Sequence, residues 1–500
     1  MKISMGPVLS LRKSDASEWH VSALIIIDKG THYPLGIVSS DAAISQPTVL
    51  MEHKKEAVLR YDITVARKPH PVNVTYAIGA GTWKFVVPAI GCSPKMAFVS
   101  CNGFSDPKAM KNVEEKNALW THMGTLHKKP DGEYNLLIMG GDQVYADQIW
   151  NTAELKKWSD LSRSKRRTRA FSGAMRQQVD DFYFTLYKER WAQTEVASML
   201  SSIPTLMTWD DHDIFDGWGS YSPEDQECKV YQGIFDAAKS HFSVFQLQVN
   251  SNLQETRPST LSNQDALTFA VEADGIAILA LDTRSERSQK QVMSAQSWDA
   301  VWNWASNLNP ASNNSPKHLL IVSPVPVVHA DFGSIETTLN WLPGEQELED
   351  DLRDHWQSKP HRKERLRMIH RLFTLMEDKN IRATFLSGDV HCAGLGVVVS
   401  NRSNSPGSRA SVINQLTSSG IVHPAPPKIM GYLLENLSDT PEEIDQGLSA
   451  YMLDFPATRK KFVLSRNFLS LEPDDKDRLW AKWYIEHDLD EPSTKTINPI

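Results

Sequence analysis

The sequence contains few cysteines and no long apolar run. Four cysteines among 500 residues are too few for the disulfide framework of a small secreted domain. No stretch of about 18 apolar residues occurs, so we expect no membrane-spanning helix. The run Ala23 to Ile27 is too short for the core of a signal peptide, and no twin-arginine pair lies near the N-terminus. These absences predict a cytoplasmic protein whose cysteines remain thiols.

The sequence also lacks an excess of positive charge. Its formal net charge is −8 at pH 7, so we expect neither specific nucleic-acid binding nor a general attraction to anionic membranes. The basic run Arg163 to Arg169 is more simply interpreted as a solvated loop than as a phosphate-binding patch, and the polar stretch Asn250 to Gln264 as a surface excursion. The sequence does not indicate an oligomeric state. An anionic small-molecule substrate must therefore be attracted by local features of its site.

Three segments of the chain differ in their hydrophobic patterns. Residues 1–90 contain short alternating or apolar runs, which predict an N-terminal antiparallel β domain resembling a sandwich. Residues 91–430 alternate short apolar runs with amphipathic stretches such as Phe171 to Leu200 and Glu364 to Asp378. That alternation is typical of α/β architecture, and we expect a catalytic domain there. Residues 431–500 mix both patterns and are expected to form a C-terminal extension packed on that domain.

Six predicted strands in the middle segment share one feature, since a polar or ionisable group follows each of them. The strands and these groups are Lys95 to Ser100 before Cys101, Leu136 to Met139 before Asp142, Thr205 to Thr208 before Asp211, Ile276 to Leu281 before Asp282 and Arg284, Leu319 to Val322 before Ser323, and Thr384 to Leu386 before Asp389 and His391. In open α/β sheets, ligands bind beyond the carboxyl ends of the strands. We therefore expect side chains that are distant in sequence to meet in one crevice.

The first cluster of chemical interest is GGDQVYADQIW, residues 140–150. A Gly-Gly-Asp turn after an apolar strand places the Asp142 carboxylate at the mouth of the sheet, and Tyr145 can face the same way. Hard cations bind carboxylate oxygens, and ferric iron also accepts phenolate. The alternative interpretation, a turn that caps a helix, stays open from this cluster alone.

The second cluster is TWDDHDIFDGWGSY, residues 208–221, which concentrates negative charge. Four carboxylates and one imidazole fall within seven positions: Asp210, Asp211, His212, Asp213 and Asp216. Such like charge is costly unless a cation or solvent relieves it. An exposed acidic loop is the alternative, but the flanking Trp209 and Trp218 favour partial burial and hence a functional role.

The third cluster is FLSGDVHCAG, residues 385–394, in which Asp389 and His391 are two positions apart. In an extended segment such residues project to the same side and can serve one metal centre. A buried structural histidine is the alternative. Cys392 has the opposite parity and is interpreted as a packing residue.

Three further residues carry weaker signals. Cys101 is a candidate thiolate ligand because it follows a strand, although packing is the ordinary role of a buried cysteine. Arg284 is a candidate phosphate clamp, or else a partner of Asp282. His329 could line the substrate pocket, but a loop histidine without that role is an equal alternative.

Four motifs in order resemble the PhoD-like alkaline phosphatase D family of the metallophosphoesterase superfamily, in the form of an intracellular branch. The motifs are SCNG at Ser100 to Gly103, GDQVYAD at Gly141 to Asp147, WDDHD at Trp209 to Asp213 and SGDVH at Ser387 to His391. The resemblance covers about residues 80 to 420. It implies a four-layer α/β/β/α sandwich with a dinuclear metal site at the carboxyl ends of the strands.

The resemblance also implies roles for individual residues. Fe3+ would be held by Cys101, Asp142, Tyr145 and His391. Ca2+, or Zn2+, Mn2+ or Mg2+ in its place, would be held by Asp142, Asp211 and Asp389. His212 would be the counterpart of the superfamily's catalytic histidine. Together with Asp211, and with Arg284 as the phosphate clamp considered above, it completes the expected set of catalytic residues. One departure is Asp216-Gly217, where exported relatives commonly have a pair of asparagines.

These observations predict metal-dependent hydrolysis of phosphomonoesters or phosphodiesters, with water as the nucleophile. Two alternatives stay open. The chain could be a phospholipase D-like or other specialised phosphodiesterase, which the same metals would serve. It could also be a non-catalytic metal-binding member of the fold, although retention of Asp142, Asp211, His212, Asp389 and His391 argues against that loss.

Overall fold

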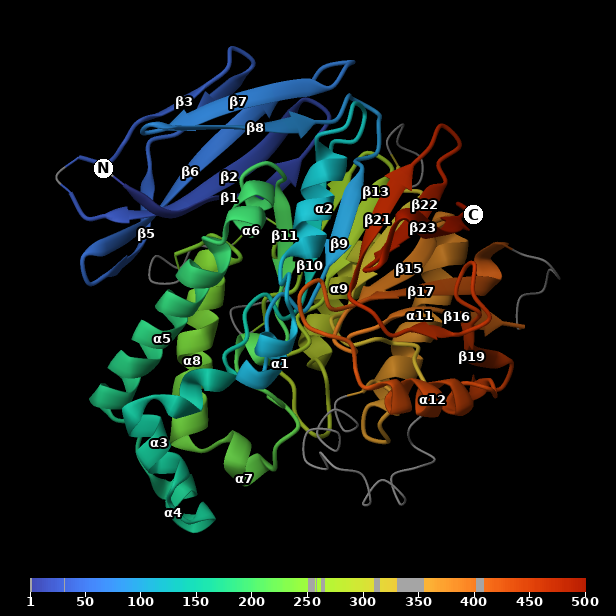
Figure 1. Ribbon diagram of the computed structural model, residues 1–500. Coiled ribbons are helices and arrows are strands. Elements are labelled where there is room, and N and C mark those ends of the chain that lie inside the picture. The colour runs from blue at the N-terminus through green and yellow to red at the C-terminus, as the bar shows by residue number, and fades with distance from the viewer. Residues whose placement is uncertain are drawn as a thin grey trace.

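Two large β-sheets lie face to face in the computed structural model of the chain (Figure 1). The structure describes residues 2–30, 32–250, 257, 259–261, 266–309, 315–330, 355–401 and 409–500. Most of the predicted excursion at 250–264 therefore lies outside the described residues. Among the described helices, none combines the length and apolarity that crossing a bilayer needs.

The first sheet runs through the N-terminal, middle and C-terminal parts of the chain. Its strands are β1 Ile3–Ser14, β2 Glu18–Asp28, β4 Ala42–Ile44, β5 Thr48–His53, β6 Glu56–Ala66, β9 Met96–Val99, β10 Leu136–Gly140, β11 Thr205–Thr208, β21 Asn467–Pro473, β22 Leu479–Ile485 and β23 Asp488–Ile497. Among the described residues they follow the order β23-β22-β21-β9-β10-β11-β1-β2-β6-β4, with β5 also paired to β6. The central strands β9, β10, β11 and β1 are parallel, so their carboxyl ends lie at one edge.

The second sheet contains the other predicted strands of the middle segment. Its strands are β12 Phe269–Ala273, β13 Ile276–Ala280, β14 His318–Val322, β15 Arg382–Ser387, β16 Ala393–Ser400, β17 Val412–Ser418, β18 Glu442–Asp445, β19 Leu448–Leu453 and β20 Phe462–Val463. The order in the described part is β12-β13-β14-β15-β17-β16-β19-β18, with β20 on β16. Strands β13, β14, β15 and β17 are parallel to one another.

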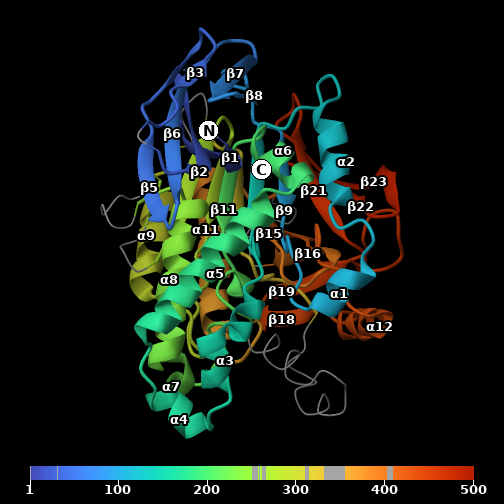
Figure 2. The same ribbon diagram turned by 60° about the vertical axis from the view of Figure 1, so that its left-hand side comes forward.

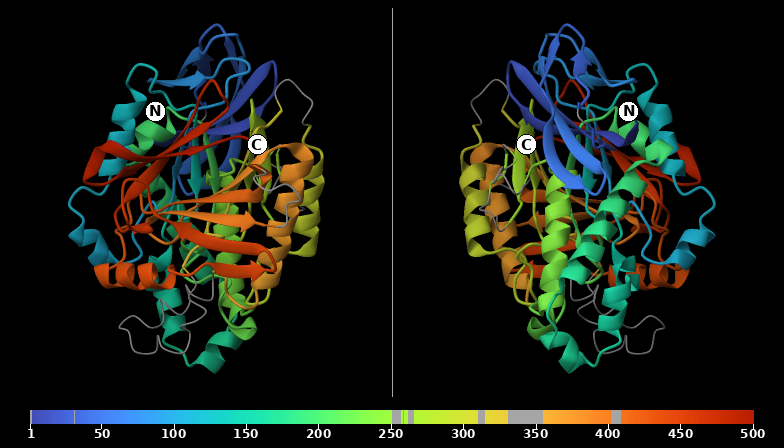
Figure 3. Two further views of the ribbon diagram at one scale, coloured as in Figure 1. Left: turned by 90° about the vertical axis from the view of Figure 1, so that its right-hand side faces the viewer. Right: turned by 90° about the vertical axis from the view of Figure 1, so that its left-hand side faces the viewer.

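The helices lie outside the two sheets, and some of them pack directly on the outer faces (Figure 1). They are α1 Pro107–Asn112, α2 Ala118–His127, α3 Ala153–Ser159, α4 Arg163–Thr168, α5 Gly173–Trp191, α6 Thr194–Leu200, α7 Pro223–Gln226, α8 Lys229–Phe245, α9 Ala295–Ser306, α11 Arg362–Lys379 and α12 Lys428–Leu437. The left view of Figure 3 shows α9 and α11 against the second sheet. Figure 2 shows α5 and α8 side by side, with α3, α4 and α7 at their far ends. The predicted basic run forms α4, which has no buried residue, and two of its arginines, Arg163 and Arg167, pair with Asp225.

The alternation of side chains along the strands explains the four layers. In β9, Met96 and Phe98 belong to the apolar core between the sheets, which also contains Leu320 of β14. Ala97 and Val99 belong instead to the core under the helices, because successive residues of a strand point to opposite faces. A third core lies between the second sheet and the helices α9 and α11. The four-layer α/β/β/α arrangement expected from the sequence is confirmed.

The N-terminal and C-terminal segments are continuous with the central sheets. Strand β1 pairs with β11, and β21 pairs with β9, so both segments extend the first sheet. The strands outside the two large sheets, β3 Gly36–Val38, β7 Val72–Ile78 and β8 Gly81–Val87, form a small sheet next to β6 in Figure 1. The domain boundaries near residues 90 and 430 stay predictions, and hydrogen bonding between strands crosses both of them.

Candidate metal centre

Side chains that follow four strands from the two sheets lie close enough to share metal ions. Three overlapping groups each have ligand atoms within 4.8 Å of one another. The groups are Cys101, Asp142 and His391; Asp142, Asp211 and His212; and Asp142, Asp210, Asp211 and Asp389. Asp142 is the one residue present in all three groups. The expected meeting of distant motifs at the carboxyl ends of the strands is therefore observed.

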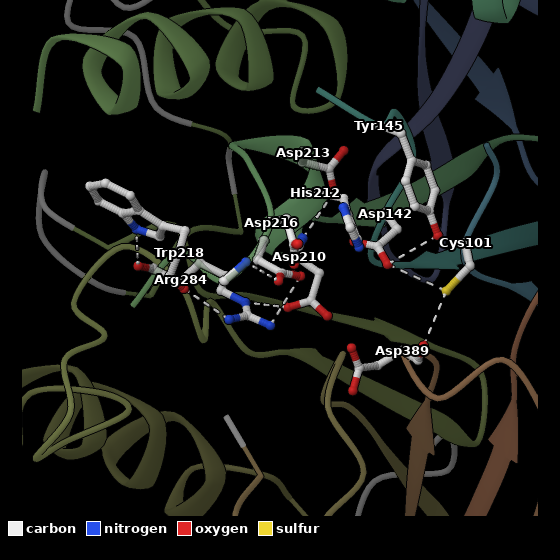
Figure 4. Close-up of polar contacts among 12 residues, drawn as sticks. Cys101, Asp142, Tyr145, Asp210, His212, Asp213, Asp216, Trp218, Arg284 and Asp389 are labelled. Atoms are coloured by element: carbon white, nitrogen blue, oxygen red, sulfur yellow. Dashed lines mark hydrogen bonds and ion pairs between the residues drawn. The ribbon is translucent and has the colours of Figure 1, made fainter. Parts of the chain in front are cut away.

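In the first half of the site, a thiol and a phenol lie beside the Asp142 carboxylate (Figure 4), and the His391 imidazole belongs to the same group of potential ligands. Cys101 Sγ lies 3.4 Å from Asp142 Oδ2, and the Tyr145 hydroxyl lies 3.5 Å from the same oxygen. The Tyr145 hydroxyl is also 3.3 Å from His391 Nε2. These four residues come from loops after β9, β10 and β15, so both sheets contribute to this half.

Burial favours the neutral form of all four of these groups. Desolvation raises the pKa of the Cys101 thiol, the Tyr145 phenol and the Asp142 carboxyl well above their ordinary values. Desolvation likewise lowers the pKa of His391 well below its ordinary value. A bound cation reverses this preference, because it stabilises thiolate, phenolate and carboxylate.

The donor set fits a metal ion. Asp142 Oδ1 is buried and has no hydrogen-bond partner among the described residues. A buried polar atom without a partner is costly, so a cation at this oxygen would remove a penalty. Carboxylate, phenolate, thiolate and imidazole together suit a transition metal such as Fe3+ better than a hard divalent cation, which prefers an all-oxygen site.

The second half of the site differs because an arginine already neutralises part of it. Arg284 is fully buried and forms an ion pair with Asp210, and its Nη2 lies 3.3 Å from Asp211 Oδ1. Its Nη1 also donates to the carbonyl oxygen of Trp218 at 3.0 Å. From the sequence, this guanidinium had two possible partners, a substrate phosphate and Asp282. The structure gives it Asp210 and Asp211, because buried carboxylates need a nearby cation.

His212 lies between the two halves and is oriented by a carboxylate. Its Nδ1 is 2.9 Å from Asp147 Oδ1, and its ring stacks on Tyr145 at 4.4 Å between centroids. Burial alone lowers the pKa of His212, but the carboxylates of Asp147 and Asp211 outweigh burial and hold this pKa well above the ordinary value. The imidazole can therefore carry a proton beside the candidate ligands.

The backbone of the candidate ligands is strained. Cys101, Asp142, Asp389 and His391 have φ values of 54°, 54°, 67° and 51°, in the left-handed region that residues with a Cβ rarely adopt. Gly388 allows the loops after β9 and β15 to approach, because a Cβ at that position would clash with Ser100. Asp213 joins two further loops by accepting hydrogen bonds from the backbone N–H groups of Gln143, Val144 and Asp210.

Other residues singled out from the sequence lie outside the three groups. Asp282 accepts hydrogen bonds from Trp209 Nε1 at 2.8 Å and from the backbone N–H of Arg284 at 3.1 Å, which holds the loop after β13 in place. His329 is buried, with its ring 5.0 Å from that of Phe462. Cys392 is fully buried within the core under α9 and α11. None of these three belongs to a potential metal-binding group found among the described residues.

Three residues around the site were not identified from the sequence. Asp147, which orients His212, lay inside the GDQVYAD motif and offered a signal that was overlooked. Ser419 and His423 follow β17, which was not predicted as a strand. The His423 ring stacks on His391 at 3.7 Å between centroids, and Ser419 contacts Cys101. Recognising Val412–Ser418 as a strand from its β-branched residues would have directed attention to both residues.

Comparisons with known proteins identify the family that this chain resembles. A family model described as PhoD related phosphatase matches residues 66–342 and 333–444. An uncharacterized protein of Saccharomyces cerevisiae is 25% identical over 529 aligned positions, which cover 87% of this chain and 74% of the yeast protein.

Two solved structures share the fold. A structure of PhoD matches 100% of this chain and 90% of its own, with a TM-score of 0.56 and 12% identity. A purple acid phosphatase from yellow lupin (Lupinus luteus) seeds matches 98% of this chain and 74% of its own, with a TM-score of 0.52 and 11% identity. At such low identity, the two structures support the architecture of the sheets and say nothing of substrates.

Proposed function

The chain belongs to the PhoD related phosphatase family, and on this premise we propose that it hydrolyses small-molecule phosphoesters at the centre built around Asp142. The observation that carries the proposal is that one carboxylate is common to all three potential metal-binding groups. A shared carboxylate is how two metal ions are commonly held close enough to act on one phosphoester. The cytoplasmic location expected from the sequence stays a prediction.

We assign Fe3+ to the first half of the site and a divalent cation to the second. Cys101, Asp142, Tyr145 and His391 would hold the iron. Asp142, Asp211 and Asp389 would hold Ca2+, with Zn2+, Mn2+ or Mg2+ as alternatives. When bound, such ions supply Lewis acidity toward the phosphoryl oxygens and lower the pKa of water at the site.

The chain's own residues supply the proton for the leaving group and hold the loops of the site in place. His212 donates a proton or a hydrogen bond from Nε2 to the leaving oxygen, because Asp147 engages Nδ1. Asp147 also accepts the backbone N–H of Asp216 at 3.1 Å, which fixes the loop on which His212 lies. Arg284 acts as a positioning residue, since its guanidinium holds Asp210 and Asp211 in place.

The proposal is tested with purified protein and its Asp142→Asn variant. We expect the wild type to contain metal by elemental mass spectrometry and to hydrolyse p-nitrophenyl phosphate or its bis ester. The comparison of these two substrates separates monoesterase from diesterase activity. Asn at position 142 should lower activity by at least about 10³-fold and remove both metals, because it weakens a ligand common to both sites. Asp160→Asn, an exposed carboxylate, is the matched control.

Two results would contradict the proposal. If Asp142→Asn retained wild-type activity and metal content, Asp142 would not be the shared ligand. If the wild type held metal but was inert toward monoesters and diesters across the pH range, a non-catalytic metal-binding role would replace the hydrolase.

A further inference from the structure

Ser419 contacts two candidate ligands that come from different sheets. It follows β17 directly and is fully buried. Its Oγ lies 3.1 Å from Cys101 Sγ and 3.0 Å from the backbone nitrogen of His391. Its own carbonyl oxygen accepts from Asn467 Nδ2 at 2.8 Å, which fixes the position of Ser419 from the side of β21. A single hydroxyl group thus connects the Cys101 loop to the His391 loop.

The direction of these hydrogen bonds follows from the chemistry of the groups. A backbone N–H can only donate, so Ser419 Oγ accepts from His391. The hydroxyl proton of Ser419 is then available to Cys101 Sγ, and the sulfur lies 3.4 Å from Asp142 Oδ2. Either atom of the Ser419–Cys101 pair can donate, but the sulfur has one proton, and when that proton goes to Asp142 or is lost to a metal, Ser419 is the donor. In such a chain each bond polarises the next.

We infer that Ser419 is a positioning residue that donates a hydrogen bond to the Cys101 sulfur and so tunes the metal held there. This inference rests on the proposed metal centre. When Cys101 gives up its proton to bind a metal, the bond from Ser419 remains and withdraws electron density from the sulfur. Hydrogen bonds to a cysteine ligand change both the affinity and the electronic properties of its metal.

The test uses Co2+ as the probe in metal-free full-length protein. Co2+ bound to a thiolate gives a sulfur-to-metal charge-transfer band, which reports the electron density on the sulfur. In Ser419→Ala we expect this band to move to lower energy and the Kd for Co2+ to rise about 10-fold, as for other residues that support metal ligands. Ser418→Ala is the matched control, because Ser418 is equally buried but its hydroxyl donates to Asn467 Oδ1.

A second pair of variants separates the sulfur contact from the backbone contact. In a Cys101→Ala background, Ser419→Ala should change the Co2+ Kd by less than about 2-fold. The sulfur that Ser419 contacts is already absent from that background, so the second substitution has no further interaction to remove. A full 10-fold effect in that background would show that Ser419 acts through His391 alone and would overturn the inference.

The outcomes distinguish this inference from the proposed function. If wild-type protein gave no sulfur-to-cobalt band, the assignment of Cys101 as a ligand would be wrong. If the band appeared at the same energy in Ser419→Ala and Ser418→Ala, Cys101 would still be a metal ligand, but the proposed role of Ser419 would be wrong. Thermal unfolding of the metal-free variants shows whether either change acts through loss of the fold.

Discussion

Both halves of the candidate site contain buried ionisable groups, but the two halves differ in how the charge of these groups is balanced. Around Cys101, Tyr145 and His391, burial shifts the pKa of each group so as to favour its neutral form. Around Asp210 and Asp211, Arg284 neutralises charge inside the protein itself. Burial opposes charge in the first half and a bound metal would favour it, whereas the carboxylates of the second half already lie beside an arginine.

This difference affects how each half is arranged when no metal is bound. Fixed ion pairs hold the second half in one arrangement whether or not a metal is bound. In the first half, burial of the potential ligands raises the free energy of the metal-free protein, and metal binding would offset that cost. Metal loss should therefore change the first half more than the second.

The largest expected effect comes from breaking the internal balance of the second half. Arg284→Met removes the cation beside the buried Asp210, and we expect the metal-free protein to lose about 3–5 kcal/mol of unfolding free energy. Urea denaturation measures this loss. Arg163→Met is the control, because Arg163 pairs with Asp225 at the surface, where an ion pair contributes at most about 1 kcal/mol. If both variants lost the same unfolding free energy, Arg284 would not be needed to balance the buried carboxylates of the second half.

A smaller effect is expected at the residue between the halves. Asp147→Asn should lower kcat about 100-fold, because the carboxylate that orients His212 and favours its proton is lost. Without Asp147 the pKa of His212 falls, so the decline of activity at high pH should begin at a lower pH. The pH profile of kcat checks this. A reduced kcat with an unmoved profile would assign Asp147 a purely structural role.

In the first half, Asp142→Asn should stabilise the metal-free protein even though it abolishes metal binding. The folded pKa of Asp142 lies well above 3.8, so its contribution to stability is present below 3.8 and is lost as pH rises toward the folded value. Asparagine mimics the neutral form and avoids that loss. Denaturation of both metal-free proteins between pH 5 and about pH 8 should show a growing advantage of the variant. A wild type more stable than the variant throughout this range would show that the first half is not strained.

The smallest effect on stability is expected for Tyr145→Phe. The phenylalanine ring keeps the stacking on His212, so the unfolding free energy of the metal-free protein should change by less than about 1 kcal/mol. The iron-loaded protein should nevertheless lose its phenolate-to-iron charge-transfer band, which a visible spectrum detects. Persistence of that band would mean that Tyr145 does not bind the iron.

Local patterns were sufficient to predict much of the architecture and most of the candidate ligands. The apolar runs before Cys101, Asp142, Asp211 and Asp389 are short, fully buried strands, and their burial on both faces is what makes them apolar throughout. The rule that ligands bind at the carboxyl ends of strands then brought the motifs together.

The remaining features depend on long-range pairing, which local patterns do not encode. That β1 joins β11 and that β21 joins β9 could not be read from either segment, because strand order is set by contacts across the whole chain. The partners of Arg284 were missed for the same reason, since Asp210 lies 74 positions earlier. Ser419 was overlooked because a lone serine after an unpredicted strand has no distinguishing chemistry until its neighbours are known.

The position of β21 has a consequence for how the enzyme matures on the ribosome. This strand covers the edge of β9, whose end carries Cys101, and its first residue, Asn467, supports Ser418 and Ser419. These contacts come from a segment that is synthesised long after β9. A nascent chain that had not yet released Asn467–Pro473 would expose β9 as an open edge and lack the support behind Cys101. Metal binding at Cys101 should therefore depend on residues 467–473 being in place beside β9.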